Sequence, residues 1–339
     1  MKNIVVVALL TLAFWVPATL ADDSIGIFET VLESSVSFSE TNAALEPAIR
    51  ASGLTLHASH VVRVPDDKHQ ARIYVLTAPS YVEAAAAESP RTISAQILRI
   101  AVFTSGEEQK TLVNMANPVA HAMVYYADSS NYDALIAAAN DAAEKIRQLV
   151  KAVPGEAVSR QTEPMRSEKH YRKFKGDGPA RMMAKFRTWK KSQLPIKMGT
   201  AVTFPAMVDH VASALESGTI ADASEAEGWE VIARIQLRDD AVYFGLTNPF
   251  IEDKMIRINS RFRKDAKSDK SPFPGVDHTA ALPTEVLVVD DGFETLVLHY
   301  GQMWRMQLYF WDSGYRAFTA NVGVPGDIVN SIESAVQAK

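Results

Sequence analysis

Residues 111–130 read TLVNMANPVAHAMVYYADSS, and residues 295–314 read TLVLHYGQMWRMQLYFWDSG. The two stretches align without a gap at an offset of 184 residues, so that Thr111 falls opposite Thr295. Each opens with an apolar run that is typical of a strand, and each carries Asp-Ser near its end. A long match between two parts of one chain indicates two copies of one structural unit.

Further blocks match in the same order along the chain. The offset changes between blocks, as expected where loops differ in length, and Pro79 falls opposite Pro249. The matched blocks are ILRIAVFTSG (97–106) with EVLVVDDG (285–292), IYVLTAPSYVE (73–83) with YFGLTNPFIED (243–253), GLTLHASHVVRVPDD (53–67) with GWEVIARIQLRDD (228–240), and VSFSETNAALEPAIRAS (36–52) with VTFPAMVDHVASALES (202–217). The sequence therefore predicts an internal repeat.

Periodicity within the first unit predicts the order β-α-β-β-α-β-β-α. Apolar residues at helical spacing indicate a helix over 40–51, with Ser39 as its N-cap and a kink or early end at Pro47. A long amphipathic helix is predicted over 132–153, and a hairpin around residues 105–106. Helices that must cover one face of a run of strands predict an α+β fold. We expect two repeated two-layer α/β sandwich domains with antiparallel sheets, joined by a basic, partly helical connector.

Short motifs in both units resemble a small bacterial α+β family that is catalogued only as a domain of unknown function. The resemblance rests on Gly53-Leu54-Thr55-Leu56 with Gly228-Trp229-Glu230-Val231, on Ala78-Pro79 with Asn248-Pro249, on Leu282-Pro283 with Asp290-Asp291-Gly292, and on Asn117-Pro118. It covers most of both units and none of the connector. The resemblance implies that the chain folds as two tandem copies of the domain found in this family. Because single-domain relatives self-associate, it also implies an internal pseudo-dimer within a monomeric chain.

The first residues have the pattern of a secretory signal peptide. Lys2 precedes an apolar run over 4–16, and Thr19-Leu20-Ala21 places small residues before a cleavage site near Ala21. This run is shorter than the roughly 20 apolar residues of a membrane-spanning helix. The sequence contains no Cys, which is compatible with a bacterial periplasm. We expect a periplasmic or secreted protein.

Charge separates the expected parts of the mature chain. Residues 160–191 carry eleven Lys or Arg against three acidic residues, a net charge of +8, whereas the whole chain is at −5. We expect a signal peptide over 1–21, a first repeat over 22–153, a basic connector over 154–195 and a second repeat over 196–339. A connector helix over 179–191, anchored by Phe186 and Trp189, would dock on an acidic domain. Contact with anionic lipid and a free linker are the alternatives.

Soft metal ligands occur in both copies of the opening stretch, but they do not align. Met115 falls opposite His299, and His121 falls opposite Arg305. The apolar residues persist between the two aligned stretches, whereas the possible metal ligands do not. This favours a role for these side chains in core packing, and no metal or cofactor is expected. The alternative is a copper-binding site of Met115, His121, His299 and Met303, with His299 and Met303 on one face of a continuing strand.

The second unit contains a dense aromatic cluster with polar tips, which suits either a core or an apolar ligand pocket. Its candidate ligand-binding residues are Tyr300, Trp304, Tyr309, Trp311 and Tyr315. No phosphate loop, nucleophile elbow or zinc motif occurs, so no catalytic residue is predicted. We expect a non-enzymatic protein that binds a small apolar molecule or a periplasmic protein partner, not nucleic acid, at a cleft between the repeats. An enzyme of unknown reaction at the same cleft remains the alternative.

Overall fold

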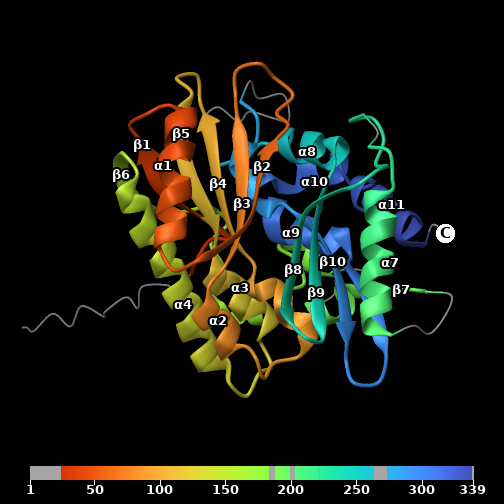
Figure 1. The fold of residues 1–339 in the computed structure, drawn as a ribbon. Coiled ribbons are helices and arrows are strands. Elements are labelled where there is room, and N and C mark those ends of the chain that lie inside the picture. Colours follow the sequence, from red (N-terminus) through yellow and green to blue (C-terminus); the bar gives the residue numbers. More distant parts are fainter. Residues whose placement is uncertain (1–23, 183–187, 199–202, 221, 263–272, 338–339) are drawn as a thin grey trace, which may run out of the picture.

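The computed structural model describes residues 24–182, 188–198, 203–220, 222–262 and 273–337. Its strands form two antiparallel sheets, each covered by helices (Figure 1). The predicted α+β class with two two-layer sandwiches is thereby confirmed. The predicted signal peptide, residues 1–21, lies outside the described residues. Among the described helices, none has both the length and the apolar character that a membrane span requires.

The first sheet has six strands in the order β2-β3-β4-β5-β1-β6. Its helical layer contains α1 (Phe38–Ala51) and α4 (Tyr132–Leu149), which is followed by a short 3-10 turn, η2 (Val150–Ala152). The strands are β1 (Phe28–Ser34), β2 (Thr55–Val62), β3 (Ala71–Thr77), β4 (Leu98–Ser105), β5 (Lys110–Ala116) and β6 (Gly155–Gln161).

The structure of helix α1 differs from two expectations, one about its N-cap and one about Pro47. Its N-cap is Ser37, whose hydroxyl accepts from the amide of Glu40, while the Glu40 carboxylate accepts from the amide of Ser37. This reciprocal capping box satisfies two amides, which Ser39 inside the helix would not do. Pro47 does not end the helix, since it lies on the exposed face, where the unpaired carbonyl of Ala43 can be hydrated.

The second sheet has five strands in the order β7-β11-β10-β9-β8. Helices α7 (Phe204–Glu216) and α11 (Val324–Gln337) cover its outer face, where Val211, Leu215, Ile332 and Val336 share a buried core with the strands. The strands are β7 (Gln193–Ile196), β8 (Glu230–Arg238), β9 (Ala241–Thr247), β10 (Thr284–Asp290) and β11 (Thr295–Tyr300).

Strand pairing follows the same pattern in both sheets. Arg99 of β4 lies opposite Val75 of β3, and Glu285 of β10 lies opposite Gly245 of β9. The helices α2 (Pro79–Ala84) and α8 (Pro249–Ile256) both begin at a proline directly after the matching strand. Residues that align in the sequence therefore occupy equivalent places in the two sheets.

The two units pack through reciprocal elements. The 3-10 segment η1 (Pro90–Gln96) of the first unit contacts β9 and β10, and η4 (Val276–Ala281) of the second unit contacts β3, β4 and β5. At the edge of this interface, the buried carboxylate of Glu252 is 2.8 Å from Nε2 of His60 and accepts from the amide of Arg63 at 2.8 Å. Hydrogen bonds across the interface join side chains to side chains and side chains to main-chain groups.

Residues assigned to a separate connector, 154–195, contribute to both sheets. Strand β6 pairs with β1, and β7 pairs with β11. Between them, α5 (Glu168–Arg172) buries Tyr171, and η3 (Gly178–Met182) precedes α6 (Trp189–Ser192). The polar sequence of β6 gave a weak strand signal because this edge strand is mostly exposed.

The predicted single helix over 179–191 is not formed. Thr188 has a non-helical backbone, with φ −59° and ψ 161°, and it acts as the N-cap of α6. Trp189 is buried against Tyr125, with ring centroids 5.3 Å apart, whereas Phe186 lies outside the described residues. Arg166 is also buried, and it donates to the carbonyl of Leu308 in the second unit at 3.2 Å. The connector thus packs against both units.

Candidate functional site

A mainly apolar pocket lies within the second unit, between α8, η4, β10, α9 (Gln302–Phe310) and α11. Its volume is about 60 Å³. One buried water needs about 10–15 Å³, so the pocket has room for roughly four to six waters. Its apolar lining includes Ile251, Met255, Ile258, Leu282, Met306, Phe310 and Ile328. This is space for a small organic molecule with apolar surface.

Local sequence rules place these side chains on the pocket walls. Asn248 caps α8 by accepting from the amide of Ile251 at 2.9 Å, and Pro249 occupies the first turn. Ile251 and Met255 are four residues apart and therefore share one helical face. In α9, Gln302, Arg305 and Met306 line the pocket at the same helical spacing.

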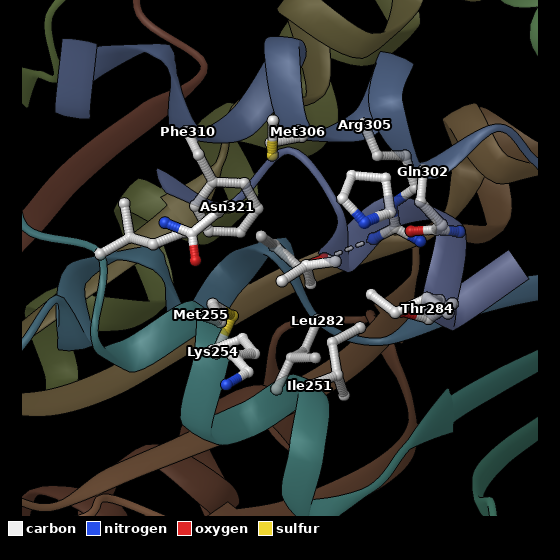
Figure 2. Close-up of a pocket in the computed structure, with 15 residues that line it drawn as sticks. Ile251, Lys254, Met255, Leu282, Thr284, Gln302, Arg305, Met306, Phe310 and Asn321 are labelled. Carbon is white, nitrogen blue, oxygen red and sulfur yellow. Dashed lines mark hydrogen bonds between the residues drawn. The ribbon is translucent and has the colours of Figure 1, made fainter. Parts of the chain in front are cut away.

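The pocket has a polar side (Figure 2). Gln302, Arg305 and Thr284 lie together there, while Phe310 and Asn321 lie across the pocket from them. The half-buried side chains of Lys254, Asn321 and Val324 belong to its more exposed part.

Arg305 is a buried cation with an incomplete set of acceptors. Its Nη2 donates to the carbonyls of Ala281 at 2.7 Å and Pro283 at 3.0 Å. Its Nη1 is buried and has no hydrogen-bond partner in the described structure, and the same holds for Oγ1 of Thr284. An unsatisfied buried polar group costs about 1–3 kcal/mol, and more when it is charged. Both atoms belong to residues that line the pocket, but almost no surface of either atom is accessible from it.

A polar cluster lies next to Arg305 at the boundary between the units. Arg99 Nη1 is 3.5 Å from Oε1 of Glu285, and both side chains are buried. Arg99 Nη2 also donates to the hydroxyl of Tyr309 at 2.8 Å and lies 3.1 Å from Nε2 of His121. Tyr309 lies 2.9 Å from the same nitrogen, and its ring contacts both guanidinium groups, with centroid distances of 5.3 Å for Arg99 and 5.5 Å for Arg305.

The charge state of this cluster follows from its surroundings. Burial lowers the pKa of His121 well below its ordinary value, and the nearby charges of Arg99 and Arg305 lower it further. A neutral ring also fits the contacts, because Nε2 can then be an acceptor, whereas the neighbouring guanidinium of Arg99 can only donate. The cluster therefore contains two guanidinium cations and the single carboxylate of Glu285.

The predicted aromatic ligand residues do not gather around one cavity. Tyr300 and Trp304 stack on each other at 5.9 Å, and both contact Tyr125 of the first unit. Tyr309 belongs to the polar cluster, and Trp311 packs on Phe318. Tyr315 is 55% exposed. Most of these side chains fill the interface or the local core.

The alternative metal ligands are also separated. Asn114 donates to the Asp277 carbonyl across the interface, so its neighbour Met115 faces the other side of the sheet. His299 lies 3.2 Å from Glu333 of α11, on the outer face of the second sheet. His121 lies at the interface. Met303 lies on α9, since the strand ends at Tyr300, which corrects the expectation of a continuing strand.

Sequence reasoning missed the pocket, whose residues come from five separate elements. The spacing of Ile251 with Met255 and of Gln302 with Met306 was a usable signal for two helical faces. No signal showed that those faces meet.

Comparisons with known proteins add little about function. No protein-family model matches the chain, and no curated protein matches it. The chain is similar to a solved structure that is described as an uncharacterized conserved protein DUF302 from Bacillus stearothermophilus. The identity is 16%, the TM-score is 0.32, and the match covers 38% of this chain and 99% of that one. A match at this level carries no argument about activity.

Proposed function

We propose that this chain is a non-enzymatic binding protein that holds a small, largely apolar molecule in the pocket of its second unit. The observation that carries the proposal is the pocket itself, with mainly apolar walls from α8, α9 and α11. Its methionine side chains, Met255 and Met306, can adjust to ligands of different shape. This location replaces the cleft between the repeats, where aromatic side chains are packed against one another.

The wider proposal is that the protein acts in the periplasm or outside the cell, after removal of residues 1–21. We also propose that its units are tandem copies of the domain of unknown function that the sequence resembles. The matching registers of β3-β4-β5 and β9-β10-β11 support this origin. In this account, the contacts of η1 and η4 hold the two copies as a pseudo-dimer.

Calorimetric titration of the mature chain with hexan-1-ol tests the binding function. We expect saturable binding of one molecule, which Val324→Trp prevents because the larger side chain fills the half-buried part of the pocket. The matched control is Val322→Trp, since Val322 is 47% exposed and does not line the pocket. Equal binding by the wild type and Val324→Trp would show that the alcohol binds elsewhere.

A further inference from the structure

We propose that a basic surface on the connector binds this protein to membranes that contain anionic lipids. The basic surface consists of Lys169, Arg172, Lys173 and Lys190. None of these four residues lines the pocket of the second unit, so the inference stands apart from the proposed binding function.

Two separate parts of the connector bring the four cations together. An open groove is lined by Lys169, Arg172 and Lys173, from α5 and its C-cap, and by Asp128 of the first unit. Lys190 of α6 lies at the same groove, because its ammonium group is 2.8 Å from the carboxylate of Asp128.

The backbone that carries these residues is anchored to the folded chain. The guanidinium of Arg172 donates to the carbonyl of Ala127 at 2.8 Å, and it lies 4.3 Å from the centroid of the Tyr132 ring. Tyr171 and Phe174 are buried on either side of this arginine in the sequence. The exposed lysines therefore extend from a fixed part of the structure.

The acidic groups of the groove already have partners. Asp128 is paired with Lys190, and Glu168 lies 3.5 Å from the guanidinium of Arg172. These two carboxylates balance two of the four cations, so the basic surface keeps a net positive charge.

The remaining cations are exposed to solvent. Lys169 and Lys173 form no ion pair within the part of the chain that the structure describes. Lys175 and Lys191 are exposed as well, and they extend the positive charge along the connector. The whole chain has a net charge of −5, but at physiological salt a surface responds mainly to charges within about 8 Å. The local positive sign therefore decides which partner this face attracts.

An anionic bilayer suits the basic surface better than a single phosphate or a nucleic acid. The unpaired cations are lysines, which act as compact point charges, whereas Arg172 is engaged by Ala127 and Glu168 and is not free for bidentate binding. The aromatic rings that could stack on bases are buried: Tyr171, Phe174 and Trp189. Lysines close to a bilayer are attracted by the negative potential of anionic lipids without any specific geometry.

Sedimentation with lipid vesicles tests the proposal on the mature chain. At low salt we expect binding to phosphatidylcholine vesicles that contain phosphatidylglycerol, and no binding to vesicles of phosphatidylcholine alone. Binding should be lost at about 1 M salt, where charges are screened within about 3 Å. The double variant Lys169→Gln/Lys173→Gln should weaken binding at low salt by about tenfold or more, because each lysine near the bilayer contributes about fivefold.

The matched control is Lys68→Gln/Lys151→Gln, which changes the net charge equally at exposed lysines outside the connector. This control should bind the vesicles as the wild type does. Equal weakening by both double variants would show a dependence on net charge alone and would overturn the proposal, as would failure of the wild type to bind the anionic vesicles. If soluble polyphosphate binds as tightly as the vesicles do, and Lys169→Gln/Lys173→Gln weakens both, the assignment to a membrane is refuted.

Discussion

Arg99 of β4 and Glu285 of β10 hold equivalent places in the two sheets, and their charged groups lie 3.5 Å apart across the boundary between the units. Each side chain is almost fully buried. Two units with the same residue at this place would bring like charges together, which is unfavourable in a buried site. The pair thus favours association of the two different units of one chain.

Loss of either partner should destabilise the protein strongly. Arg99→Met leaves Glu285 buried without its cation, and Glu285→Met leaves Arg99 without its anion, so each should lower the free energy of unfolding by about 3–5 kcal/mol. The double variant should be more stable than the sum of the two losses predicts. Urea unfolding measures all three, and strictly additive losses would contradict a direct pairing.

The neutral state of His121 predicts a loss of stability in acid. Its folded-state pKa is lowered, so the unfolded state binds more protons as the pH falls below the ordinary value of about 6.5. The stability that comes from the neutral His121 ring is present above that pH and is lost below it. The free energy of unfolding should fall by at most about 1.4 kcal/mol per pH unit. His121→Gln should remove this part of the pH dependence between pH 7 and pH 5. Unfolding curves with the same pH slope in both proteins would refute it.

Docking of the connector should depend on the buried pair of Arg166 and Asp177. Arg166 Nη2 donates to Asp177 at 2.8 Å, and the same guanidinium donates to carbonyls of α9. Asp177→Asn should therefore loosen residues 166–177 and raise the rate of trypsin cleavage there by about tenfold or more, since 1.4 kcal/mol of local opening is one tenfold step. The matched control is Glu168→Gln, which weakens an exposed pair with Arg172 and should leave the rate unchanged.

The strand-to-helix transitions of the two units could be predicted from the sequence because they depend on local pattern. Leu-Thr-x-Pro marks the end of a strand and the start of a helix in both units, and the structure places Pro79 and Pro249 at those starts. The helix after Asn117 was missed, because Pro118–Tyr125 is buried along its whole length and lacks a polar face. Its counterpart α9 was missed as well, which led to the expectation that His299 and Met303 share a strand.

The candidate site depends on contacts that sequence spacing does not encode. Arg305 and Thr284 lie 21 positions apart, on a helix and a strand, and the apolar wall comes from residues as distant as Ile251 and Ile328. The aromatic residues were prominent in the sequence, yet most of them pack at the interface, as Tyr300 and Trp304 do against Tyr125.

The most direct test of the central claim is an NMR titration that observes the methionine methyl groups. Met255 and Met306 line the pocket, whereas Met115 is buried in the first unit and Met207 belongs to the core beneath α7. With methyl-labelled methionine, hexan-1-ol should shift the signals of Met255 and Met306 in a saturable manner and leave those of Met115 and Met207 in place. Unchanged signals of Met255 and Met306 at high hexan-1-ol concentration would contradict the proposed binding site.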